Sequence, residues 1–244
     1  MTDRVSDRLG QVRKAVASGV LRRRAADAAD AHTCAPLILA SGTREFAFFL
    51  GVSPGQCIAF LAFAFASKHG RFSWRRHRVA VSEDGIVRAV LAVHDGRRTM
   101  WDDVHVAWML INFFGFVCAV RMLLRGLILE GELPAPTREQ TLIAHCAVDE
   151  AWRGRGVFSA LFDDAMRAGG LRQGPVREIV LDVLASNVRA RALYERLGFT
   201  EMPKSRRRSA RLPQELISTR MRFDATEREV SLDSSRIEPT LDGR

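Results

Sequence analysis

The first half of the chain switches between helical and strand-like spacing of its apolar residues. Two apolar helical stretches are expected between residues 44 and 67, because Pro54 interrupts the pattern in the middle. Apolar and polar residues then alternate over 78–94 on both sides of Gly85, and this pattern predicts a β-hairpin.

A long helix is expected near Asp103 to Leu129, and it contains the most apolar run of the chain, Val106 to Val120. The run is shorter than the roughly 20 residues that a membrane-spanning helix needs, and Arg121 ends it. We interpret this segment as a buried or surface-docked helix. Association with a membrane surface is possible and is not favoured.

The second half repeats a strand and helix rhythm. Apolar runs predict strands over 141–148 and 178–185, and amphipathic patterns predict helices over 157–169 and 187–198. Two strands separated by a helix predict a parallel pair with a crossover, and hence an α/β layered domain. A last strand is expected near 215–223.

The two ends of the chain differ from this core. Residues 1–31 are expected to form a basic amphipathic helical segment, because apolar residues recur at helical spacing over 5–20 among arginines. Packing on the main domain is preferred over a lipid or nucleic-acid arm, and nucleic acid is disfavoured because no aromatic residue interleaves with the charges. The main domain is expected over 32–223, with an apolar helical insertion at about 103–130. The tail, 224–244, is expected to be disordered.

The composition fits one globular domain with extra segments at its ends. The 244 residues are 47% hydrophobic and 27% charged, and 37 Lys and Arg against 28 Asp and Glu give a formal charge of +9. This sign favours anionic partners, whether nucleic acid, anionic lipid or a phosphorylated cofactor. The four cysteines and six histidines show no metal-ligand spacing, so no metal is expected. A charged beginning without a signal peptide predicts a cytoplasmic protein.

Chemistry is expected first in the stretch from Cys146 to Phe162. A strand that ends at Val148 leads into a turn with Gly154 and Gly156, and a helix begins just after it. Backbone N–H groups at the positive end of that helix would form an anion site, which phosphate can approach where glycine leaves the backbone bare. A tight turn with two glycines and no ligand is the alternative on these residues alone.

Two motifs weigh in favour of the anion site: RGRGVFSALF, which starts at Arg153, and LDVLASNVRARALYERLGF, from Leu181 to Phe199. From about Thr141 to Phe199, the sequence resembles the GCN5-related N-acetyltransferase (GNAT) family in the spacing and order of both motifs. The resemblance implies that family's fold, a mixed, mostly antiparallel twisted sheet with a central parallel strand pair flanked by helices. It also implies acetyl-CoA as co-substrate.

The resemblance, together with the chemistry of the residues, assigns roles to single positions. By resemblance, the Val148 N–H polarises the thioester carbonyl and Tyr194 protonates the departing thiolate. His145 is a candidate base for the amine proton, and a structural histidine is the alternative. Asn187 is implied to orient the cofactor, with capping of the next helix as the alternative. The residues expected to contact the cofactor are Ala147, Val148, Arg153, Gly154, Arg155, Gly156, Val157, Asn187 and Tyr194.

One position departs from the family pattern. Phe158 stands where the family usually has Gly or Ala. The bulky side chain leaves the backbone amide available, and it is expected to narrow the cofactor groove or to shift the helix.

These motifs predict an acetyl-CoA-dependent N-acetyltransferase that moves an acetyl group to a primary amine by direct attack in a ternary complex. The alternative is a non-catalytic CoA-binding or interaction module that docks through its basic and apolar helices. The acceptor amine is not identified. The helical segments at 44–67 and 103–129 are expected to form its walls, and the second is also suited to a homodimer face.

Overall fold

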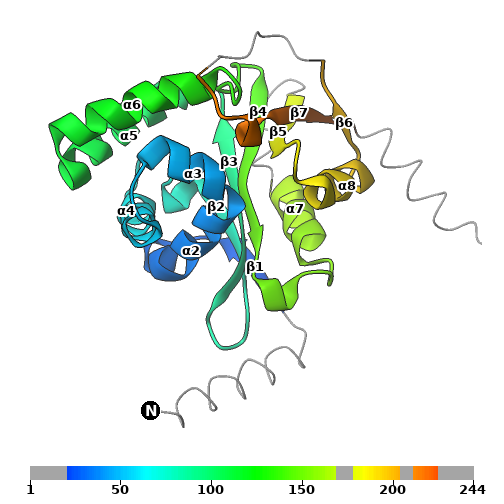
Figure 1. Ribbon diagram of the computed structural model, residues 1–244. Coiled ribbons are helices and arrows are strands. Elements are labelled where there is room, and N and C mark those ends of the chain that lie inside the picture. The colour runs from blue at the N-terminus through cyan, green and yellow to red at the C-terminus, as the bar shows by residue number, and fades with distance from the viewer. Residues whose placement is uncertain (1–20, 169–177, 204–210, 225–244) are drawn as a thin grey trace, which may run out of the picture.

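A seven-stranded sheet organises the computed structural model of the protein, which describes residues 21–168, 178–203 and 211–224 (Figure 1). The strands are β1 (Arg22–Ala25), β2 (His77–Val81), β3 (Val87–Asp95), β4 (Gln140–Val148), β5 (Glu178–Leu184), β6 (Phe199–Glu201) and β7 (Ser218–Phe223). Their spatial order is β1-β2-β3-β4-β5-β7-β6. Only β4 and β5 pair in parallel; the other pairs in this sheet are antiparallel. The predicted fold class is confirmed.

Helices cover both faces of this sheet. They are α2 (Ala31–Ser41), α3 (Thr43–Leu50), α4 (Pro54–Ala66), α5 (Thr99–Phe114), α6 (Phe116–Glu130), α7 (Val157–Arg167) and α8 (Val188–Arg196), with short 3-10 turns at Ala28–Asp30, Trp74–Arg76, Glu150–Trp152 and Gln214–Leu216. Figure 1 shows α2, α3 and α4 on one face and α7 and α8 on the other, while α5 and α6 extend past the sheet. The sheet therefore separates two hydrophobic clusters.

Strand alternation assigns the central residues to these two clusters. Val79 and Val90 pack with the cluster of α2, α3 and α4, whereas Ala80 and Leu91, one residue further along, pack with the cluster of α7 and α8. All four are at most 1% exposed, because successive side chains of a strand point to opposite faces and both faces are covered.

The predicted break between the first two helical stretches has a clear local cause. Helix α3 ends at Leu50, where Gly51 adopts a left-handed conformation with φ of 62°. Helix α4 begins at Pro54 and is capped by Ser53, whose side chain and that of Gln56 form a capping box. Within the described ranges no single helix is long and apolar enough to cross a membrane; α3 and α4 meet these criteria only as a pair bent by 91°.

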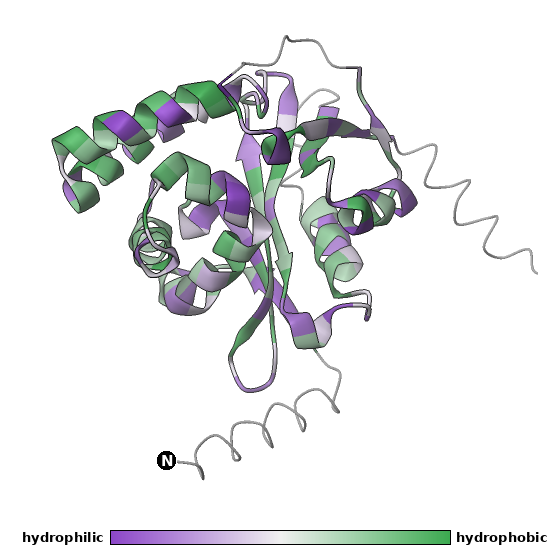
Figure 2. Ribbon diagram, viewed as in Figure 1, coloured by the Kyte–Doolittle hydropathy of each residue, from purple (hydrophilic) through white to green (hydrophobic). Residues whose placement is uncertain are grey.

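The expected single helix near Asp103 to Leu129 is wrong, because the structure has two helices there. Gly115 separates α5 from α6 with φ of 81°, a value that residues with a side chain rarely adopt. The two helices form a hairpin whose outer side is rich in apolar residues (Figure 2). The large apolar side chains exposed on it are Met100, Trp101, Val104, Trp108, Ile111, Phe113, Phe116, Val117, Val120, Leu124 and Leu127.

The expected helical segment over 1–31 is wrong for its last part. Arg22–Ala25 form strand β1, which pairs antiparallel with β2, so the sheet begins ten residues before the predicted domain start at residue 32. Hydrogen bonds from Arg24 to Asp30, both at 2.7 Å, connect this strand to the start of α2. The rest of the predicted segment, residues 1–20, and the tail beyond Asp224 lie outside the described residues.

Candidate active site

The parallel ladder between β4 and β5 ends halfway along β4. Gln140–Ile143 pair with Glu178–Leu181, and β4 continues to Val148 without further pairs to β5 in the described ladder. On the β3 side the register shifts, and His145 has a φ of 51°, the only positive value among the described residues that are not glycine. This bulge turns β4 away from β5 and opens a gap between their C-terminal ends.

The backbone N–H of Val148 points toward this gap. The Asp149 N–H donates to the Arg88 carbonyl oxygen at 2.7 Å, and Val148 is the residue paired with Ala89. Hydrogen-bonded and non-hydrogen-bonded pairs alternate along an antiparallel ladder. The Val148 pair is therefore a non-hydrogen-bonded one, and its N–H faces away from β3 toward the side of β5.

The loop between β4 and α7 has a conformation that favours glycine. Gly154 and Gly156 have φ of 75° and 70°, and a Cβ added at either would meet no atom of the described residues within 4 Å. Helix α7 starts at Val157 directly after Gly156, which provides no side-chain cap. The first amides of a helix lack intrahelical acceptors and carry the positive end of its dipole, so this loop has the backbone geometry of an anion site.

A cavity of about 770 Å³ lies beside this loop, between the β4 bulge and α8. Of the expected cofactor contacts it is lined by Ala147, Val148, Arg153, Gly154, Gly156, Val157, Asn187 and Tyr194. Four arginines also line it, namely Arg44, Arg153, Arg189 and Arg196. A concave site with backbone amides and guanidinium groups suits a ligand with several phosphates.

Two of the expected contacts have other roles for their side chains. The Arg155 guanidinium lies 5.6 Å from the centre of the Trp152 ring, and Arg155 is not among the lining residues of the cavity. The Asn187 side chain accepts a hydrogen bond from the Ala190 N–H at 3.1 Å and so caps α8, which was the alternative role.

Tyr194 lies on the inner side of α8 and lines the same cavity. It is 7% exposed, and burial raises its pKa well above 10, with a smaller contribution from the neighbouring Cys146 thiol. The Phe158 ring meets the Tyr194 ring edge to face at 5.8 Å inside the cluster of α7 and α8. Phe158 is buried in this cluster, and α7 begins at Val157, directly before it.

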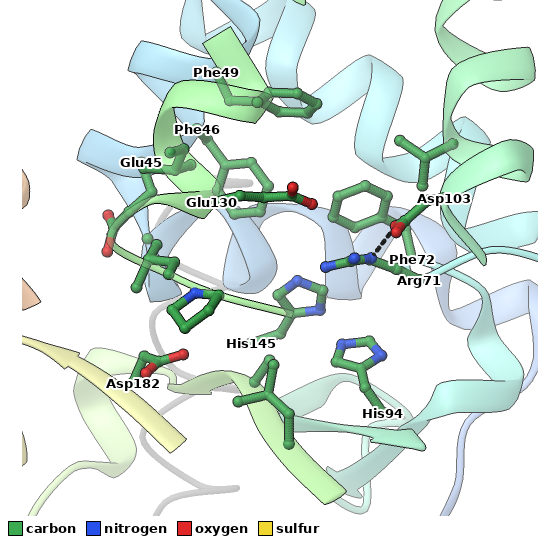
Figure 3. Close-up of a pocket in the computed structure, with 18 of the residues that line it drawn as sticks. Glu45, Phe46, Phe49, Arg71, Phe72, His94, Asp103, Glu130, His145 and Asp182 are labelled. Atoms are coloured by element: carbon green, nitrogen blue, oxygen red, sulfur yellow. Dashed lines mark hydrogen bonds and ion pairs between the residues drawn. The ribbon is translucent and has the colours of Figure 1, made fainter. Parts of the chain in front are cut away.

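A second cavity, of about 520 Å³, lies on the other side of the β4 bulge (Figure 3). Its lining residues come from α3, α5, α6 and the strands, so both segments expected to form the acceptor walls contribute to it. The two cavities meet at the bulge. The residues that line both are Ser41, Gly42, Glu45, Ile143, Ala144, His145 and Asp182.

His145 ends a chain of hydrogen bonds that fixes its tautomer. His77 Nδ1 lies 2.8 Å from the Ser73 carbonyl oxygen, and His77 Nε2 lies 3.0 Å from His145 Nδ1. A carbonyl oxygen only accepts, so a neutral His77 donates from Nδ1 and accepts at Nε2. His145 then donates from Nδ1, which places the lone pair of its ring on Nε2.

Burial keeps this group of histidines neutral, and we expect a marked loss of stability in mild acid. Burial lowers the pKa of His77 to about 4, and that of His94 and His145 well below 6.5. The unfolded chain binds these protons near pH 6.5 and the folded chain does not, so the free energy of unfolding falls as the pH drops below 6.5. The slope is at most about 1.4 kcal/mol per pH unit for each histidine.

Urea denaturation between pH 7 and pH 5 measures this slope. The His94→Gln variant should lose part of it, whereas His32→Gln, which replaces an exposed histidine on α2, should keep it. Equal slopes in the wild type and in His94→Gln would show that the acid sensitivity lies elsewhere.

The sequence did not identify His77, His94 or Arg71 as members of this site. His77 and His145 are 68 positions apart, and only the pairing of β2, β3 and β4 brings them together. The sequence contains one weak indication of their role. His77 and His94 lie near the two ends of the predicted hairpin, in strands that are otherwise apolar, and a polar residue in a buried strand often has a function.

Comparisons with known proteins agree with this architecture. A model of the acetyltransferase (GNAT) family matches residues 28–199. An N-acetyltransferase from Staphylococcus aureus Mu50 superposes with a TM-score of 0.62 at 14% identity, over 83% of this chain and 100% of its own. SsHAT superposes with a TM-score of 0.58 at 17% identity, over 82% of this chain and 96% of its own. Another acetyltransferase superposes with a TM-score of 0.57 at 20% identity, over 83% of this chain and 98% of its own. These structural likenesses show the fold. No curated protein matches the sequence significantly.

Proposed function

The chain belongs to the acetyltransferase (GNAT) family, which makes it an acyltransferase, and we propose that it moves an acetyl group from acetyl-CoA to a primary amine by direct attack in a ternary complex. The observation that carries this proposal is the meeting of the two cavities at the β4 bulge. A donor in one cavity and an amine in the other would face each other beside His145.

The larger cavity is the proposed site of acetyl-CoA, which would supply the acetyl group as an activated thioester. The first amides of α7 and the bare backbone at Gly156 would hold the pyrophosphate, with positive charge from Arg153 and Arg189. The Val148 N–H, on the β5 side of the bulge, would stabilise the negative charge that develops on the carbonyl oxygen.

His145 is the proposed general base. Its pKa is lowered by burial, so it is neutral at pH 7, and its Nε2 carries the lone pair. As the nitrogen–carbon bond forms and the carbon–sulfur bond breaks, the nitrogen loses one proton to Nε2. The low pKa makes His145 a weak base. The same apolar cavity would also lower the pKa of a bound amine, because burial disfavours its charged form, and a weak base is then sufficient.

Tyr194 is the proposed acid that returns a proton to the sulfur. Its raised pKa keeps the phenol protonated at neutral pH. The neighbouring Cys146 thiol is also buried, which raises its pKa to about 12. The departing CoA thiolate would accept the proton of the phenol, so that one proton taken at nitrogen is balanced by one given to sulfur.

Initial-rate kinetics test the ternary complex. We expect double-reciprocal plots for acetyl-CoA and an accepted amine to intersect, because both substrates must be bound before the acetyl group moves. Parallel lines would indicate a covalent acetyl-enzyme and would contradict direct attack. Tight CoA binding without CoA thiol release for any amine would favour the non-catalytic module.

A further inference from the structure

Three polar atoms in the second cavity are buried without a hydrogen-bond partner among the described residues. They are Glu45 Oε2, Arg71 Nη2 and His94 Nδ1. All three residues line this cavity. Buried polar groups are nearly always paired in folded proteins, so three in one cavity point to a ligand that supplies the missing partners.

The Arg71 guanidinium is held in place while one of its nitrogens stays available. Its Nε donates to Asp103 Oδ1 at 2.5 Å, and its Nη2 is buried with no hydrogen-bond partner among the described residues, while the residue lines the cavity (Figure 3). His94 is 6% exposed, and its ring lies edge to face with that of His145 at 5.5 Å. Arg71 and His94 together form one polar end of the cavity.

Glu45 and Asp182 mark the opposite end. Figure 3 shows these two carboxylates on one side of His145, with Arg71 and Asp103 on the other. Glu45 and Asp182 also line the cofactor cavity, whereas Arg71 and His94 line only the second one. Asp182 is already paired with Arg220, at 2.9 and 2.7 Å, whereas Glu45 Oε2 has no hydrogen-bond partner among the described residues.

The two ends of the second cavity therefore differ in the chemical groups that they present. A primary amine must reach the junction with the cofactor cavity to be acetylated, and there it meets the Glu45 carboxylate. The far end presents a guanidinium nitrogen, for which a carboxylate is the best partner. The wall between the two ends is mostly apolar and includes Phe46, Phe49, Phe72, Val106, Leu123 and Leu127; the Glu130 carboxylate also lies in it (Figure 3).

We propose that the acceptor is a small amino carboxylate with an apolar body, bound with its amine at Glu45 and its carboxylate at Arg71 and His94. This inference rests on the proposed acetyl transfer for the identity of the amine end. The carboxylate end rests on Arg71 and His94 and can be tested separately from turnover.

Matched substrate pairs test the carboxylate end. We expect 4-(2-aminoethyl)benzoate and 6-aminohexanoate to be acetylated with a kcat/KM about 10- to 100-fold above that of 2-phenylethylamine and pentylamine, which lack only the carboxylate. The Arg71→Gln variant should remove this preference, so that each amino carboxylate and its plain amine are acetylated with a similar kcat/KM. Arg75→Gln is the matched control, because Arg75 lies in the same segment but is exposed, over the Trp74 ring at 5.2 Å.

Calorimetric titration with 3-phenylpropanoate, without acetyl-CoA, provides a second measurement that needs no turnover. Binding by the wild type and by Arg75→Gln, with a Kd at least about 10-fold weaker in Arg71→Gln, supports the inference. If the plain amines are acetylated as well as the amino acids, the transferase stands and the carboxylate site is wrong. If nothing is acetylated, the proposed function fails, and the titration still decides: binding that does not depend on Arg71 overturns the site.

Discussion

The Gly156→Glu variant is expected to lose measurable binding of acetyl-CoA, with a Kd at least about 100-fold above that of the wild type. Two effects act together. Gly156 has φ of 70°, where a residue with a side chain is strained by about 1–2 kcal/mol. The new carboxylate would also stand at the first amides of α7, where it neutralises the positive end of the helix and repels phosphate. Isothermal titration with acetyl-CoA measures the effect.

The chain offers a matched control for this substitution. Gly85, in the turn between β2 and β3, has φ of 78°, and a Cβ there would also meet no atom within 4 Å. Gly85→Glu therefore introduces the same charge and a similar strain away from the cavity, and it should bind acetyl-CoA like the wild type. Unchanged affinity in Gly156→Glu would place the phosphates elsewhere.

The Tyr194→Phe variant is expected to lower kcat by about 100-fold or more, with little change in the KM for acetyl-CoA. The phenol is the proposed proton source for the departing sulfur, and its removal leaves the ring in place. That ring packs against Phe158 at 5.8 Å and Phe199 at 6.0 Å, so the variant should keep its fold. Steady-state kinetics measure the change in kcat, and thermal unfolding checks the fold.

Cys146→Ala is the control for Tyr194. It removes the thiol that neighbours the phenol but keeps the phenol itself, and we expect a much smaller loss of kcat. A Tyr194→Phe enzyme as fast as the wild type would exclude the phenol from the reaction. Equal losses in both variants would indicate that the local packing matters more than the proton.

The parts of the fold with a local pattern were predictable from the sequence. The positions of β4, α7, β5 and α8 follow from apolar periodicity, and Gly154 and Gly156 marked the loop because their positive φ needs glycine. Strand β1 was missed, because Arg22–Ala25 is a short edge strand with three arginines, and only its partner β2 gives it a place in the sheet. The Gly115 break was missed because apolar residues continue on both sides of it.

The candidate site was predictable to a similar degree. Tyr194, Val148 and the α7 loop lie together in one motif-bearing region, and the structure places them around one cavity. Arg71 and His94 come from segments far from that region, and neither carries a motif. Their relevance depends on atoms left without partners after folding, a property that spacing along the chain does not encode.

The proposed acetyl transfer is measured by following the acetyl group itself. Purified protein is incubated with acetyl-CoA labelled in the acetyl carbon and with a set of alkylamines, arylalkylamines and amino acids, and the products are separated and identified by mass spectrometry. If the protein transfers acetyl groups as proposed, labelled N-acetyl product forms with at least one amine in the wild type and in Gly85→Glu but not in Gly156→Glu. Label that stays on CoA with every amine, while the wild type binds acetyl-CoA, would contradict the proposed transfer.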